Sequence, residues 1–168
     1  MIKKTFVLVL LITGWVAAGR GANPAEGVQV LQEAGGWWIH GEKRHVRIDE
    51  SNLSMTVKDP AATWSFSSAA AEPLTVQQTT AARCRLLDAT KRIIAPYETG
   101  FKKGLRITLD RFVAQGRELD FGVVLSVCVE GEEEDLVGEI AALERKAVLR
   151  QCLWPNALDP RQSDYLVM

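Results

Sequence analysis

The sequence predicts an all-β protein, built as an antiparallel β-sandwich, and two observations support that prediction. First, apolar and polar residues alternate in several short runs, which is typical of strands with one buried face. Leu53, Met55 and Val57 alternate with polar residues, and the run from Phe121 to Val129 places five apolar side chains on one face. Second, turns rich in Gly, Pro, Asp and Asn separate these runs at short intervals, as in sandwiches and barrels. We therefore expect many short strands, in a sandwich that is complete or cut short.

The first 18 residues have the organisation of a secretory signal peptide. A short basic start is followed by the apolar run Thr5–Thr13 and by small residues before a cut after Ala18. The apolar run is too short to span a bilayer. We expect a signal peptide over residues 1–18, a flexible leader over 19–27 and a single β-sandwich domain over 28–168. The protein would then be secreted or periplasmic.

The length and charge of the chain limit which kinds of molecule we expect it to bind. Removal of the signal peptide would leave about 150 residues, enough for one domain with a hydrophobic core. Loss of Lys3 and Lys4 would reduce the 20 basic residues to 18 against 21 acidic ones, a net charge of −3. The sequence has no dense basic patch, which nucleic-acid binding would require. It also has no second apolar run long enough to cross a membrane. We expect neither nucleic acid nor, after signal cleavage, a membrane as a partner.

The three cysteines, Cys84, Cys128 and Cys152, are widely separated in the sequence. Their spacing excludes the CxxC arrangement of redox and zinc sites. Export would permit one disulfide, but the sequence leaves its presence and pairing open. Cys128 and Cys152 lie in strand-like runs, so burial as small apolar side chains is the simpler expectation.

The segment from residue 36 to residue 41, GWWIHG, contains the most prominent candidate contact residues. Neighbouring side chains of an extended chain point to opposite faces, so one of Trp37 and Trp38 should enter the core and the other should be more exposed. An exposed tryptophan could stack on a sugar ring, or it could be covered by a loop or a second domain. We take Trp37, Trp38 and Trp64 as the candidate residues for contact with a carbohydrate or another domain.

Two further groups of polar residues have no clear chemical role. His40 and His45 are the only histidines, and in one continuous strand their odd spacing would place them on opposite faces. We therefore expect surface histidines and no metal site. The turn over residues 130–135 concentrates five carboxylates, but it lacks the spacing of an EF-hand, so we expect a solvated acidic turn.

The stretch over residues 135–146 is ambiguous between helix and strand. Leu136, Ile140 and Leu143 have helical spacing, whereas Val137, Gly138 and the flanking β-rich sequence favour strands. We expect at most one short helix there, or a pair of strands in its place.

The last third of the chain resembles a known family. The segments LDFGVVLSVCVEGEEEDLVGEIAALE and VLRQCLWPNALDPRQSDYLVM contain an aromatic–proline pair, Trp154–Pro155, and an acidic residue, Asp164, before the strand-like Tyr165–Val167. Over residues 36–168 this pattern resembles the N-terminal galactose-mutarotase-like β-sandwich of large secreted bacterial glycoside-hydrolase-like proteins. In that family a (β/α)8 barrel follows the sandwich and holds the catalytic carboxylates, so no catalytic residue transfers to this chain.

The resemblance implies a secreted, non-catalytic accessory or N-terminal module of a carbohydrate-active protein. We expect no cofactor and no metal site. Its partner would be a catalytic domain of the same parent protein, or a carbohydrate. Because Tyr165–Met168 looks like a strand without its continuation, we expect a fragment of a longer protein. The alternative is a self-contained periplasmic or extracellular β-barrel or sandwich that binds a ligand or inhibits an enzyme. A small hydrolase ranks last, because the sequence has no nucleophile–base or metal constellation.

Overall fold

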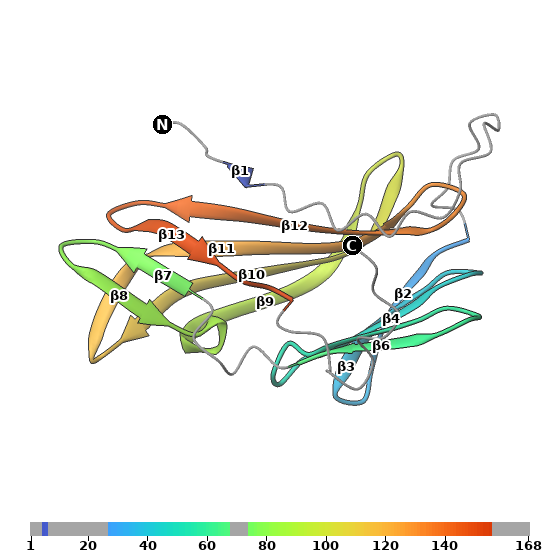
Figure 1. Cartoon of the computed structure of the whole chain (residues 1–168), viewed down its shortest axis with the longest axis horizontal. Coiled ribbons are helices and arrows are strands. Elements are labelled where there is room, and N and C mark those ends of the chain that lie inside the picture. Colours follow the sequence, from blue (N-terminus) through green and yellow to red (C-terminus); the bar gives the residue numbers. More distant parts are fainter. Residues whose placement is uncertain (1–4, 7–26, 68–73, 156–168) are drawn as a thin grey trace.

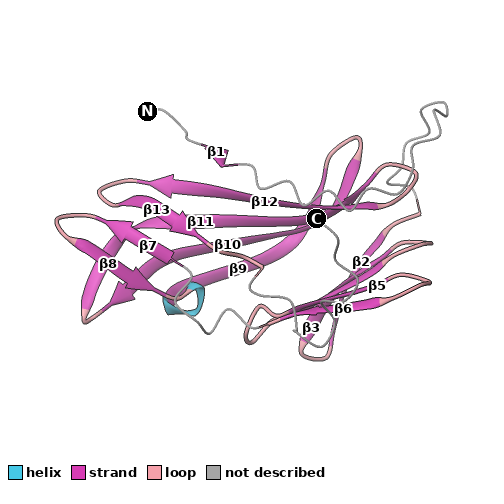
Figure 2. Cartoon of the chain, in the orientation of Figure 1, coloured by secondary structure: helices cyan, strands magenta, loops and turns pink. Residues whose placement is uncertain are grey.

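A computed structural model describes residues 5–6, 27–67 and 74–155 of the chain. Within these ranges the strands form three antiparallel sheets, and the helical content is a single short 3₁₀ turn, η1 (Leu86–Asp88) (Figures 1 and 2). No helix in this part of the chain has the length and apolar character needed to cross a membrane. The all-β prediction is confirmed. Most of the predicted signal peptide, almost all of the leader and the terminal Tyr165–Met168 lie outside the described residues.

The longest strands form a five-stranded sheet in the order β1-β12-β11-β10-β9. Its members are β9 (Ala89–Glu98), β10 (Lys102–Ala114), β11 (Arg117–Glu130), β12 (Asp135–Glu144) and the two-residue β1 (Thr5–Phe6). The ambiguous stretch after residue 135 is therefore a single strand. Its apolar Leu136 and Ile140 lie on the inner face of the sheet, where burial of that face outweighs the helical spacing.

Two smaller sheets complete the fold. One has the order β2-β3-β4-β5-β6, and the other has the order β13-β7-β8. The first consists of β2 (Gln29–Glu33), β3 (Gly36–His40), β4 (His45–Asp49), β5 (Met55–Lys58) and β6 (Thr63–Phe66). The second consists of β7 (Leu74–Gln77), β8 (Ala81–Cys84) and β13 (Val148–Cys152). None of the three sheets closes on itself, so the described residues do not form the barrel of the alternative hypothesis.

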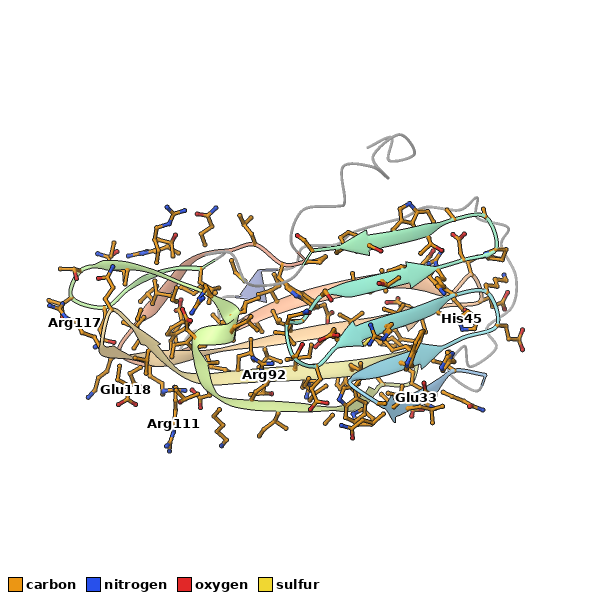
Figure 3. All side chains as sticks on the ribbon, turned by 90° about the horizontal axis from the view of Figure 1, so that it is seen from below. Glu33, His45, Arg92, Arg111, Arg117 and Glu118 are labelled. Atoms are coloured by element: carbon orange, nitrogen blue, oxygen red, sulfur yellow. The ribbon has the colours of Figure 1, made fainter. Side chains whose placement is uncertain are left out.

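The two smaller sheets lie near opposite ends of the long sheet (Figure 1). Seen from below, the β2–β6 sheet lies across one end of the long sheet, and η1 lies toward the other (Figure 3). The sandwich thus has one long layer and one layer made of two pieces. This division lets strands of only four or five residues cover a sheet whose central strands have 13 and 14 residues.

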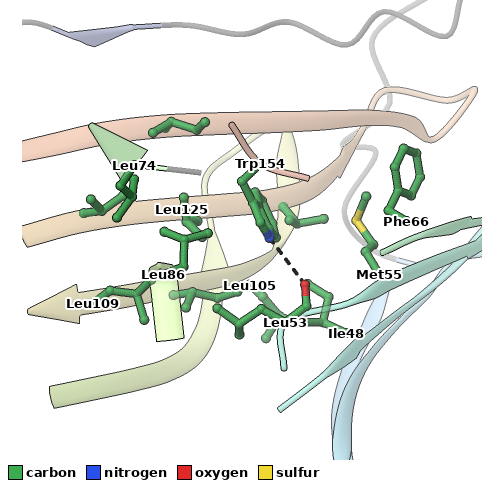
Figure 4. Close-up of a cluster of buried hydrophobic side chains, with 14 of the residues drawn as sticks. Ile48, Leu53, Met55, Phe66, Leu74, Leu86, Leu105, Leu109, Leu125 and Trp154 are labelled. Carbon is green, nitrogen blue, oxygen red and sulfur yellow. Dashed lines mark hydrogen bonds between the residues drawn. The ribbon is translucent and has the colours of Figure 1, made fainter. Parts of the chain in front are cut away.

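The core lies between these layers and contains residues of all three sheets. Leu105 and Leu125 of the long sheet belong to one buried cluster with Leu74 of the three-stranded sheet and Ile48 of the β2–β6 sheet (Figure 4). Trp154, just after β13, is only 2% exposed. Its indole N–H donates a hydrogen bond of 3.4 Å to the backbone carbonyl of Leu53, in the loop between β4 and β5 (Figure 4). The aromatic–proline pair of the resemblance thus joins the two halves of the split layer.

Close contact between β10 and β11 requires a glycine at position 104. Gly104 is paired with Cys128, and a Cβ on Gly104 would overlap the backbone of Val127 and Cys128. The three cysteines are thiols rather than members of disulfides; Cys84 and Cys128 are buried and Cys152 is partly exposed. Burial of the two strand cysteines as small side chains is thus confirmed for Cys128 and holds in part for Cys152.

Candidate functional site

The outer face of the β3–β4 hairpin brings together an aromatic and three basic or titratable side chains. Trp38 and His40 belong to β3, and His45 and Arg47 belong to β4. In the antiparallel register Trp38 pairs with Arg47 and His40 pairs with His45. Alternation along each strand sends these four side chains away from the core. We call this group the tryptophan–histidine row.

The contacts within the tryptophan–histidine row are short and ordered. The rings of Trp38 and His40 stack with centroids 5.2 Å apart and an interplanar angle of 9°. The guanidinium carbon of Arg47 lies 5.9 Å from the Trp38 ring centroid, within the range of a cation–π contact. The Nδ1 atoms of His40 and His45 are 3.1 Å apart, so one nitrogen donates a hydrogen bond and the other accepts it.

The expectation that His40 and His45 point to opposite faces is wrong. It assumed one continuous strand, whereas the chain reverses between them. The amide of Gly41 donates a 2.9 Å hydrogen bond to the carbonyl of Arg44, which closes the turn between β3 and β4. Residues paired across antiparallel strands share a face, and the turn therefore converts an odd spacing into a direct side-chain contact.

The three candidate tryptophans do not form one platform. Trp37 points into the core and is 9% exposed, whereas Trp38 is half-buried on the outer face. The prediction that the two point to opposite faces is confirmed. Trp64 lies opposite the buried Val57, at the edge of the same sheet, and packs half-buried against the core. Only Trp38 thus remains at an outer surface within a group of polar side chains.

The sequence predicted a solvated acidic turn between β11 and β12. That prediction is wrong for one of its carboxylates. Glu134 is only 6% exposed. Its carboxylate accepts hydrogen bonds from the backbone N–H groups of Glu42, at 2.6 Å, Lys43, at 3.0 Å, and Arg44, at 2.8 Å. The Arg44 guanidinium in turn donates a 2.5 Å hydrogen bond to the backbone carbonyl of Glu134.

The position of Glu134 fixes the turn that presents the tryptophan–histidine row. Three converging N–H groups form a concave anion site, and here the anion is the Glu134 carboxylate from the turn between β11 and β12. Gly41 is needed in this turn because a Cβ there would overlap the Glu134 carboxylate. The neighbouring Glu133 is exposed and pairs with Lys43 at 2.9 Å. Charge clustering in the sequence indicated an acidic turn but not which of its carboxylates is buried, because the partner backbone lies about 90 residues away.

A second polar region lies at the opposite end of the molecule. A hollow of about 310 Å³ is lined by Asp110, Arg111, Glu118, Leu119, Asp120 and Arg145. Figure 3 shows Arg111 and Glu118 there, far from His45 at the other end. Arg145 donates one hydrogen bond of 2.6 Å to Asp110 and another of 2.5 Å to Asp120.

The charges of this hollow do not suit acid–base catalysis. Burial raises the pKa of Asp110, but hydrogen bonds from the Arg145 guanidinium and the backbone N–H of Arg111 outweigh it and hold the pKa below its usual value. Hydrogen bonds to Asp120 and Asp110 raise the pKa of Arg145. The Asp110–Arg145 pair therefore stays charged at neutral pH, whereas a catalytic acid needs a carboxyl whose pKa is raised toward neutrality.

Cys128 and Cys152 also lack the properties of a nucleophile. Burial raises the pKa of Cys128 to about 11, and burial together with the nearby Cys84 raises the pKa of Cys152 to about 12. Reactive cysteines instead have a lowered pKa in an electropositive, partly exposed site. Both thiols therefore remain protonated at neutral pH and serve packing.

No protein-family model matches the sequence, and a comparison with curated proteins finds no match. Solved structures do match. The chain is similar to the α-N-acetylgalactosaminidase NagBb from Bifidobacterium bifidum in its complex with Gal-NHAc-DNJ, with a TM-score of 0.59 and 22% identity over 73% of this chain. It is also similar to the GalNAc complex of that enzyme, with a TM-score of 0.56 and 22% identity over 77% of this chain.

The match covers only 19% of the NagBb chain in the first structure and 18% in the second. The ligand-free form gives the same result, with a TM-score of 0.55, 21% identity and coverage of 78% of this chain and 18% of that one. At this identity the likeness concerns the fold. The chain is thus similar in structure to a segment that makes up less than a fifth of a glycoside hydrolase.

Proposed function

We propose that this chain is a secreted, non-catalytic β-sandwich module of a carbohydrate-active, glycoside-hydrolase-like protein. The observation that supports it most directly is the likeness of fold to a minor part of an α-N-acetylgalactosaminidase. The galactose-mutarotase-like pattern of the sequence supports the same assignment. The partner of the module would be a catalytic domain of the same parent protein, or a carbohydrate.

The properties of the titratable groups agree with a module that lacks catalysis of its own. Hydrolysis of a glycosidic bond by two carboxyl groups needs one of them as an acid with a raised pKa and an open path for the sugar between them. Asp110 and Asp120, two carboxylates of the hollow, are instead bound to one guanidinium. Despite burial, that guanidinium lowers the pKa of Asp110, which is the opposite of what a group that protonates a leaving group needs.

The outer face of the β2–β6 sheet is the surface that we assign to contact with a carbohydrate. Trp38 offers an apolar ring, and the imidazole and guanidinium groups beside it can donate hydrogen bonds to hydroxyl groups. Arg47 also fills the space above Gly36, because a Cβ on that glycine would lie 3.6 Å from its guanidinium nitrogens. A sugar that stacks on Trp38 would have to move Arg47 aside, which its 36% exposed side chain permits.

Calorimetry and tryptophan fluorescence with N-acetylgalactosamine test this assignment. The full chain should bind the sugar weakly, and Trp38→Ala should abolish binding. Trp64→Ala is the matched control, because Trp64 lies on the inner face of the same sheet; it should leave binding unchanged. Equal binding by the wild type and Trp38→Ala would refute the contact surface.

Two measurements test the rest of the proposal. Incubation of the full chain with a chromogenic α-N-acetylgalactosaminide should release no product, and a turnover that Asp110→Asn abolishes would overturn the non-catalytic assignment. Export of the chain from a bacterial host should yield a product that begins at Gly19. Retention of an uncleaved product in the cytoplasm would contradict secretion.

A further inference from the structure

The His40–His45 pair of the tryptophan–histidine row has a geometry that a metal ion can use. The two Nδ1 atoms are 3.1 Å apart. Because histidine binds zinc at about 2.0–2.1 Å, an ion equidistant from both atoms would subtend an angle of about 98°. That angle lies between the roughly 90° of a square-planar copper or nickel site and the roughly 109° of a tetrahedral zinc site. Small side-chain rotations would therefore suit either geometry.

The sheet holds the two rings in place before any ion binds. His40 and His45 are directly paired residues of adjacent strands, so the backbone sets the separation of their side chains. Trp38 stacks on the His40 ring and restricts its rotation. The Glu134 carboxylate holds the turn between the two histidines through three backbone N–H groups. The two rings are thus already ordered in the folded protein, so that binding of an ion would cost little further side-chain entropy.

We propose that His40 and His45 bind one divalent transition-metal cation of the type that imidazole prefers, namely Cu²⁺, Ni²⁺ or Zn²⁺. The ion would be held by the two Nδ1 lone pairs. The ring that now donates the shared hydrogen bond would move its proton from Nδ1 to Nε2, so that binding releases no net proton. This inference does not depend on the proposed carbohydrate function.

The surroundings limit how tightly such an ion is held. The described residues contain no group of three or more His, Cys, Asp or Glu side chains that could hold a metal, so water would complete the coordination shell. Lys58 is paired in register with His45, and Arg47 lies beside Trp38. Both cations oppose the ion, so we expect weaker binding than at a closed structural zinc site, with Cu²⁺ bound more tightly than Ni²⁺ or Zn²⁺.

Titration of the full chain with Cu²⁺ tests the proposal. One equivalent should bind, and the electron paramagnetic resonance spectrum should show coupling to two imidazole nitrogens. Bound Cu²⁺ should quench the fluorescence of the adjacent Trp38, and Trp38→Phe should lose that part of the quenching while retaining the imidazole coupling. His40→Gln and His45→Gln should each weaken binding at least about tenfold, whereas Lys58→Ala should leave it unchanged or strengthen it.

Two results would overturn the proposal. One is Cu²⁺ affinity in His45→Gln within twofold of the wild type. The other is a spectrum without imidazole coupling, as an ion on the thiols would give. The urea midpoint of each variant, measured without metal, shows whether it is folded. If His40→Gln does not fold, His45→Gln and the spectrum of the wild type still decide the question.

Discussion

Removal of the Glu134 carboxylate should destabilise the protein far more than removal of its neighbour. Glu134→Ala deletes three hydrogen bonds from backbone N–H groups to a charged acceptor, each worth about 1.5–3 kcal/mol. Water can replace the carboxylate at the exposed Glu42 and Lys43, but the N–H of the buried Arg44 loses its partner. We therefore expect a loss of about 3 kcal/mol in the free energy of unfolding, rather than the full sum of the three bonds.

Urea denaturation measures this loss. With a slope of about 2 kcal/mol per molar urea, a loss of about 3 kcal/mol lowers the midpoint by about 1.5 M. Glu134→Gln keeps one acceptor oxygen, so its effect should be about half as large. Glu133→Gln is the matched control, because Glu133 belongs to the same turn and makes only an exposed ion pair with Lys43; its midpoint should not move. Equal midpoints for Glu134→Ala and Glu133→Gln would refute the reasoning.

Three further predictions concern Gly41, Gly104 and Asp110. Gly41→Ala should displace the Glu134 carboxylate and lower the free energy of unfolding about as much as Glu134→Ala. In a double-mutant cycle, most of the effect of Gly41→Ala should disappear in the Glu134→Ala background. Additive effects of the two substitutions would contradict this. Gly104→Ala should unfold the chain, because its Cβ overlaps the backbone of β11, whereas Gly138→Ala on β12 meets no atom within 4 Å and should fold normally by circular dichroism. Asp110→Asn should be less stable than the wild type at neutral pH, and the gap should close in acid. The folded pKa of Asp110 lies below its ordinary value of 3.8, so its contribution is complete above that value and is lost as the pH falls through the folded pKa. A gap in the urea midpoint that stays constant as the pH falls from neutral into acid would argue against it.

The prediction of the fold succeeded where local pattern and tertiary environment agree. Alternation over Met55 and Val57, and over the run from Phe121, predicted strands whose inner faces are buried. Leu53, which began the first alternation, is buried but lies in the loop before β5. The stretch after Asp135 stayed ambiguous because its spacing suits both a helix and a strand. Pairing with β11 decided it, since Leu136 and Ile140 can then join the core.

The candidate site could be predicted only in part. Trp37 and Trp38 were correctly assigned to opposite faces, because that geometry depends on two neighbouring residues alone. The exposure of Trp64 could not be judged, since it depends on which face of β6 meets the long sheet. The His40–His45 contact was missed because a four-residue turn, and not a straight strand, lies between them.

The sequence by itself determined the all-β class, several of the strands and the alternation of faces along them, because these properties depend on residues within a few positions of one another. Only the tertiary structure decided that Glu134 holds the β3–β4 turn, that Trp154 reaches Leu53 and that Arg145 joins Asp110 to Asp120. Each of these contacts joins residues 25 to 101 positions apart. Their geometry follows from how the three sheets pack, and no local pattern of residues specifies that packing.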